Sequence, residues 1–122
     1  MRLLTFQIAD YKLALPSEAV TTVGKPFREG KVHQVDLFKR VGARPGPGAD
    51  HPAITCSLGD ALYEFTVDKI LNLEDYQFGQ LKQWPKVLPD AGIFSGVVDI
   101  GDTLFLIISI DRMGVGGHRA KR

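Results

Sequence analysis

Three segments of the chain share one pattern, in which two apolar runs flank a two-residue break that ends in aspartate. The breaks are Ala9-Asp10, Gly59-Asp60 and Gly101-Asp102. Glycine accepts the positive φ that a tight two-residue hairpin turn requires, so the pattern predicts three β-hairpins. Hairpins repeated at wide spacing are typical of a small β-barrel protein, and no catalytic motif repeats with them.

Alternation within the apolar runs predicts which side chains are buried. Leu4, Phe6 and Ile8 share one face of the first strand, since successive side chains of a strand point to opposite sides. Residues 104–110 are apolar on both faces, as expected of a strand covered on two sides at the seam between layers. The only cysteine, Cys56, falls on the apolar face of its strand, so we expect a buried thiol and no intrachain disulfide.

Between the hairpins the signals are weaker. The stretch Ser17-Glu18-Ala19-Val20 predicts a capped helical turn, in which Val20 and Val23 press one face inward at i, i+3 spacing. Residues 31–38 predict a short strand with Val35 among its apolar positions.

The organisation expected from these elements is a single domain over residues 1–113. The stretch 42–52, rich in glycine and proline, predicts a flexible surface connection and the one internal boundary. Residues 114–122 are glycine-rich and basic, which predicts a frayed tail.

Composition narrows the class of protein. The 122 residues are 44% hydrophobic and 24% charged, as in ordinary globular domains. The net charge of +1 argues against a protein whose main task is neutralising phosphates. The start of the chain does not read as a signal peptide, and no apolar run approaches the roughly 20 residues of a membrane-spanning helix. We therefore expect a cytoplasmic protein.

Candidate catalytic groups are present but are not arranged for chemistry. Four aspartates stand at the ends of predicted strands, namely Asp36, Asp68, Asp99 and Asp111. Asp68 and Asp111 are each followed by a basic and an apolar residue, which favours structural capping over acid–base work. The histidines, His33, His51 and His118, lack metal-ligand spacing and are expected to face solvent. We expect no enzyme, no cofactor and no metal.

The order of the short motifs resembles the CheW-like domain, the adaptor of bacterial chemotaxis and related two-component signalling. Six stretches carry the resemblance, which spans about residues 3–113: Phe6-Gln7-Ile8 through Ala14-Leu15-Pro16; Val20 with Val23; Val35-Asp36-Leu37 ending in Val41-Gly42; Val67-Asp68-Lys69-Ile70; Phe94-Ser95-Gly96-Val97; and Ile107 to Arg112 with Met113. The resemblance implies an all-β fold of two small SH3-like barrels that share one core.

The chain departs from this family in two places. Only Lys25 to Lys31 stands where the family has a further strand and an Asn-Leu-Arg-Gly turn, so we expect an incomplete first barrel. Its unpaired edge would be covered, dimerised or occupied by a partner. The second departure is Glu64, at a position where the family tends to have a small residue.

The resemblance implies a non-catalytic adaptor that docks onto the regulatory domain of a CheA-type histidine kinase, a chemoreceptor tip or another CheW-like domain. The partner-binding positions carried over from the family are Val20, Val23, Val35, Gly96 and Val97. The alternative for all five, and above all for Val35 and Val97, is an ordinary place in the core. Two other functions stay open: an OB-like barrel that binds single-stranded nucleic acid, and a homodimer paired through the open barrel edge.

Overall fold

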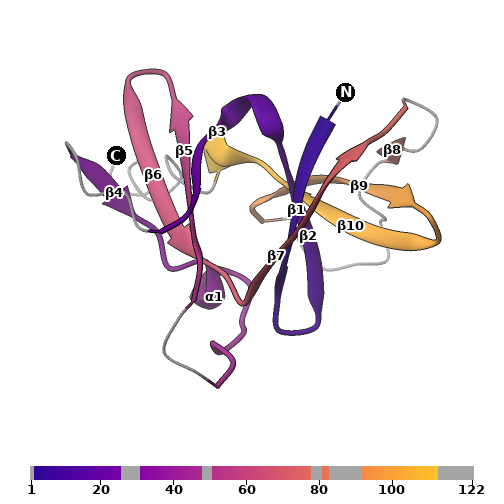
Figure 1. The fold of residues 1–122 in the computed structure, drawn as a ribbon, viewed down its shortest axis with the longest axis horizontal. Helices are drawn as coiled ribbons and strands as arrows, with labels where there is room; N and C mark the ends of the chain where they lie inside the picture. Colours follow the sequence, from indigo (N-terminus) through magenta and orange to yellow (C-terminus); the bar gives the residue numbers. More distant parts are fainter. Residues whose placement is uncertain (1, 26–30, 48–50, 78–80, 83–91, 113–122) are drawn as a thin grey trace.

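The structure is a computed structural model that describes residues 2–25, 31–47, 51–77, 81–82 and 92–112. It consists almost entirely of β-strands in two sheets that lie side by side (Figure 1). The elements in chain order are β1 (Arg2–Ile8), β2 (Tyr11–Pro16), the 3₁₀ turn η1 (Ser17–Ala19), β3 (Val20–Gly24), β4 (Val32–Gln34), α1 (Leu37–Arg40), β5 (Ala53–Leu58), β6 (Ala61–Thr66), β7 (Lys69–Asp75), β8 (Leu81–Lys82), β9 (Phe94–Ile100) and β10 (Thr103–Ile108).

All three predicted hairpins form with two-residue turns. Strands β1 and β2 pair through Ile8 and Tyr11, and the hairpins β5–β6 and β9–β10 close in the same way. Gly59 and Gly101 have φ values of +62° and +55°, as the turns require. In the first turn the positive φ of 53° falls on Ala9, which has a Cβ and is therefore strained.

The hairpins are distributed over two sheets. The larger sheet has six strands in the order β7-β1-β2-β10-β9-β8, and the smaller has four in the order β3-β5-β6-β4. The parallel pairing of β2 with β10 joins the first hairpin to the last. Neither sheet closes on itself within the described residues, so the all-β class is confirmed while the barrels remain open.

One hydrophobic core is shared by the two sheets. Leu4, Phe6 and Ile8 of β1 contribute to it from the larger sheet, and Ile54 and Phe65 contribute from the smaller sheet. A second cluster lies on the opposite face of the larger sheet and is made by Leu3, Ala14, Val98, Phe105 and Ile107. The larger sheet is therefore covered on both faces, and the core between the sheets fixes how they sit together.

The seam expected along residues 104–110 is confirmed in part. Phe105 and Ile107 belong to the second cluster and Ile108 to the shared core, so β10 does present apolar side chains to both layers. Leu104, at the start of the strand, is 51% exposed and lies outside both clusters.

Two predictions of local structure were wrong. The turn expected at residues 17–20 does form, as η1, but it ends at Ala19 and has no side-chain cap. Val20 and Val23 do not lie on it, because both belong to β3. The strand expected over residues 31–38 is limited to Val32–Gln34, because Asp36 begins a helix. The Asp36 carboxylate accepts a hydrogen bond from the Lys39 amide at 3.2 Å, which caps α1.

Candidate functional site

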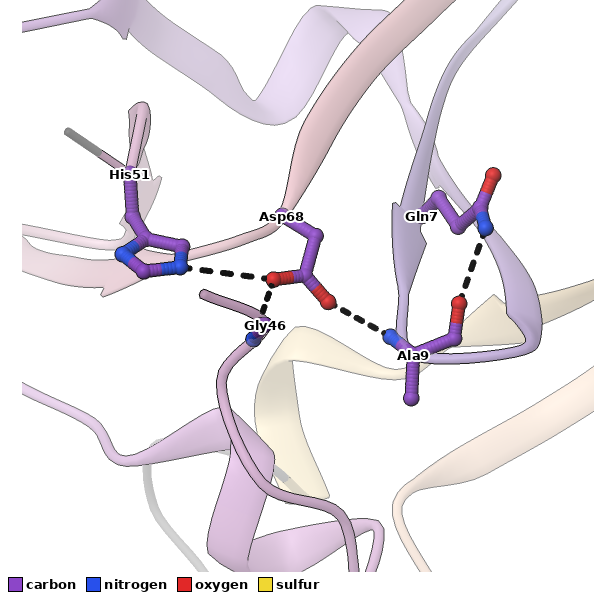
Figure 2. A network of polar contacts seen from close by, with 5 residues as sticks. All are labelled: Gln7, Ala9, Gly46, His51 and Asp68. Carbon is purple, nitrogen blue, oxygen red and sulfur yellow. Dashed lines mark hydrogen bonds and ion pairs between the residues drawn. The ribbon is translucent and has the colours of Figure 1, made fainter. Parts of the chain in front are cut away.

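Asp68 lies between β6 and β7, where the chain passes from the smaller sheet to the larger one. Its Oδ2 accepts a hydrogen bond from the Ala9 amide at 2.7 Å, and its Oδ1 accepts one from the Gly46 amide at 2.9 Å (Figure 2). The Nε2 atom of His51 lies 3.4 Å from the same Oδ1. One carboxylate therefore connects three segments of the chain: its own, the turn of the first hairpin at Ala9, and the stretch that contains Gly46 and His51.

The pKa of the Asp68 carboxyl reflects these contacts. Partial burial raises the pKa, because desolvation penalises the charged form. The amides of Ala9 and Gly46 and the nearby His51 outweigh that effect, so the pKa is held below its usual 3.8. Asp68 is thus a stable anion at neutral pH, which suits a structural acceptor and not a proton-transferring base.

A surface cleft of about 370 Å³ opens beside this carboxylate. Asp10 and Lys69 line the cleft together with Asp68 and His51. Its lining includes no serine, threonine or cysteine that could act as a nucleophile next to the imidazole. In the described ranges no group of three or more His, Cys, Asp or Glu side chains could hold a metal ion. The contacts of Asp68 fasten two loops to the start of β7.

The expectation that histidines face solvent was wrong for His51. Its side chain is 19% exposed, and its ring packs edge-on against Phe38 of α1 with centroids 6.0 Å apart. His33 is exposed and stacks on Tyr63 at 5.0 Å. His118 and the tail 114–122 lie outside the described residues. Asp68 was expected to have a structural role as a capping residue. Its role is structural, but its carboxylate accepts from the Ala9 and Gly46 amides of two loops and caps no helix.

Val20 and Val23 share one face of β3 for a reason the sequence did not reveal. A β-bulge lies between Val20, which pairs with Cys56, and Thr22, which pairs with Thr55. The extra residue shifts the alternation by one, so Val20 and Val23 both lie on the side of the shared core. Val20 packs against that core, whereas Val23, opposite the fully buried Ile54, is 44% exposed.

The other three predicted partner-binding residues lie elsewhere. Val35, directly after β4 at the far edge of the smaller sheet, is half-buried against the shared core. Gly96 is buried, and Val97 is 2% exposed on β9 of the larger sheet. The five residues therefore do not gather in one place, and Val23 is the only one whose side chain is largely open to a partner.

Sequence reasoning missed an exposed apolar pair on β7. Leu71 and Leu73 are 36% and 55% exposed on a strand that forms the edge of the larger sheet in the described residues. Leu73 pairs with the buried Leu4, and a second bulge falls between the partners of Thr5 and Phe6. The bulge contains Leu71 and is bracketed by Ile70 and Leu73, which are three residues apart as Val20 and Val23 are on β3, and this spacing was the available signal.

The face of the smaller sheet turned away from the shared core carries a polar row. Thr22, Thr55, Glu64 and Gln34 are cross-strand neighbours on β3, β5, β6 and β4. Glu64 is 4% exposed, and its two carboxylate oxygens accept from Gln34 Nε2 at 3.0 Å and Thr55 Oγ1 at 3.1 Å. The hydroxyl of Thr22 is buried and has no hydrogen-bond partner. A polar side chain at position 64 is thus accommodated by matching polar residues on the adjacent strands.

Aromatic side chains offer no stacking platform within the described residues. Phe6, Phe65 and Phe105 are at most 5% exposed, as their alternation predicted. Tyr11 is 43% exposed, but it stands apart from the buried rings. Single-stranded nucleic-acid binders stack bases on exposed aromatic rings, so no observation favours that alternative.

The described residues have the all-β class of fold that the motifs predicted, and the fold is similar to that of a CheW protein. A solved structure with this fold is the scaffolding protein TtCheW from Thermoanaerobacter tengcongensis, which superposes with a TM-score of 0.75. The match covers 88% of this chain and 87% of that protein at 19% sequence identity. A scan against protein families and a search of curated proteins gave no match. Among the described residues, no helix is long and apolar enough to cross a membrane.

Proposed function

We propose that this chain is a non-catalytic adaptor of chemotaxis-like two-component signalling in the cytoplasm. Its partners would be the regulatory domain of a CheA-type histidine kinase, a chemoreceptor tip or another CheW-like domain. The observation that carries the proposal is the fold shared with a scaffolding protein over most of both chains. The hydrogen bonds that the Asp68 carboxylate accepts from two backbone amides give it a structural role, which is compatible with an adaptor.

Docking would use the open edge of β3. Within the described residues β3 pairs only with β5, and its partly exposed Val23 continues the apolar face of Ile54 to the surface. An exposed strand edge can add an extended segment of a partner through main-chain hydrogen bonds, and a neighbouring apolar side chain such as Val23 adds contact area. Val20, on the same strand, packs against the shared core and would support this surface from below. Val35, Gly96 and Val97 lie away from this edge, after β4 and on β9, and would take no direct part in the contact.

The test is the substitution Val23→Asp, measured by the affinity for the regulatory domain of a CheA-type kinase. A charge at an apolar contact is expected to weaken binding at least tenfold, or about 1.4 kcal/mol. The fold should persist, because Val23 is 44% exposed and an added carboxylate remains solvated.

The matched control is Thr21→Asp, which places the same charge at the exposed bulge position of the same strand. The control should bind within about twofold of the unaltered chain, because it lies off the apolar face. Equal binding by both variants, or loss of the circular dichroism spectrum in Val23→Asp, would overturn the assignment of Val23. A second copy is the competing occupant of this edge, and light scattering of the isolated chain would reveal it.

A further inference from the structure

The polar row across the smaller sheet ends at an unsatisfied group on an open edge. Gln34 on β4 and Thr55 on β5 both donate hydrogen bonds to the Glu64 carboxylate on β6. Thr22 on β3 pairs with Thr55 and is the last member of the row. Its hydroxyl is the only buried side-chain group of the described residues that lacks a hydrogen-bond partner. A buried hydroxyl without a partner destabilises a fold, so its presence calls for an explanation beyond the isolated chain.

The edge of β3 beside this hydroxyl is open to another backbone. After the bulge, Thr22, Val23 and Gly24 pair with β5 on one side, and no described strand pairs with them on the other. A Cβ built on Gly24 would meet no atom of the described residues within 4 Å. The unsatisfied hydroxyl is therefore carried by the strand next to which an extended segment of a partner can lie.

Alternation along a strand fixes the chemistry that such a segment needs. A residue placed directly opposite Thr22 projects from the same face of the sheet, with the two Cβ atoms about 4.5–5.5 Å apart. A serine, threonine, asparagine or glutamine there can hydrogen bond to the hydroxyl. The residue opposite Val23 projects from the other face, on the side of the fully buried Ile54, and is best matched by an apolar side chain.

We propose that Thr22 is the specificity-determining contact of the β3 edge. Its partner is an extended segment with a hydrogen-bonding side chain opposite Thr22 and an apolar side chain opposite Val23. This inference rests on the proposed function, because it takes β3 as the docking edge. On binding, the partner's polar group satisfies the hydroxyl, whereas a segment with apolar residues at both places leaves it unpaired and binds more weakly.

The test is Thr22→Val in the full chain, because valine keeps the shape of threonine and removes the hydroxyl. Affinity for the regulatory domain of a CheA-type kinase, measured by titration calorimetry, should fall about five- to tenfold, since the partner's polar group is left unpaired. The urea midpoint of the same variant should stay constant or rise. A purely structural side chain would not lower the affinity while the stability is kept.

Two further variants serve as matched controls. Thr22→Ser keeps the hydroxyl and should bind within about twofold of the unaltered chain. Thr21→Val makes the same exchange of side chains at the exposed bulge position and should also bind within about twofold.

Each contrary outcome is distinct. Unchanged affinity in Thr22→Val would overturn the inference, and so would a clear loss of stability, which would show that the hydroxyl is already bonded within the chain. If Val23→Asp weakens binding and Thr22→Val does not, the docking edge stands and only the contact at Thr22 fails. If neither variant weakens binding, the docking edge fails as well. A dimer of the isolated chain that Thr22→Val dissociates would assign the edge to a second copy and overturn the inferred partner.

Discussion

The aromatic pair Phe6–Phe65 joins the two sheets, and its removal gives the sharpest test of the shared core. Phe6 comes from β1 and Phe65 from β6, with ring centroids 5.7 Å apart at an interplanar angle of 45°. The two residues are 0% and 1% exposed. Truncation of a fully buried phenylalanine to alanine destabilises proteins by about 3–5 kcal/mol. Domains typically have a free energy of unfolding of only about 5–15 kcal/mol. Phe65→Ala should therefore lose a large part of this stability.

The measurement is urea unfolding at 25 °C followed by far-ultraviolet circular dichroism. Leu104→Ala is the matched control, because Leu104 is a strand leucine that is 51% exposed, and it should lose less than about 1 kcal/mol. A double-mutant cycle with Phe6→Leu and Phe65→Leu should give a coupling free energy of about 0.5–1.5 kcal/mol, as expected for an aromatic pair. A loss below about 1.5 kcal/mol for Phe65→Ala, with an unchanged slope against urea, would refute the idea that this ring holds the sheets together.

Three further outcomes are expected. Ala9→Gly should stabilise the chain by about 1 kcal/mol in the same urea assay, since it relieves a φ of 53° that an L side chain rarely adopts; a destabilised variant would contradict this reasoning. Thr22→Val should be neutral or stabilising by about 1 kcal/mol, because it removes a buried hydroxyl without a hydrogen-bond partner; a clear loss of stability would show that the hydroxyl is satisfied. Burial raises the pKa of the Cys56 thiol to about 12, so Ellman's reagent at pH 8 should react with the thiol only after unfolding; rapid reaction in the native state would place the thiol at the surface.

The hairpins could be predicted from the sequence because their determinants are local. A tight turn requires positive φ at one or two adjacent positions, and Gly59-Asp60 and Gly101-Asp102 supply them within the turn itself. The same local logic identified the burial of Cys56, since alternation along a single strand decides which face a side chain occupies.

The segment of β3 was misread because a bulge imitates helical spacing. Val20 and Val23 stand at i, i+3, a spacing that places two side chains on one side of a helix. In β3 the extra residue opposite β5 produces the same result in extended backbone. The inward face of Val20 was therefore predicted correctly from a wrong element, and the pair Ile70 and Leu73 on β7 repeats this pattern.

The contacts around Asp68 could not be read from the sequence because they are not local. The carboxylate binds Ala9 and Gly46, which lie 59 and 22 residues away along the chain. Nothing in the spacing of these residues encodes their meeting, which follows from the order of strands in the two sheets. The contact of His51 with Phe38 is also non-local. It could not be predicted because Phe38 was assigned to a strand, whereas it lies on α1.

The parallel contact of β2 with β10, through Leu13 and Leu106, has a consequence for how the protein is made. On the ribosome the first hairpin emerges early. The strand that pairs with β2, namely β10, is the last of the described strands to be translated. Until then, the edge of β2 that pairs with β10, and its apolar side chains such as Leu13, are exposed to water or to a chaperone. Folding must wait for a contact across nearly the whole polypeptide, which makes it slow relative to helical proteins of this size. Nascent chains stalled before β10 should therefore stay sensitive to protease.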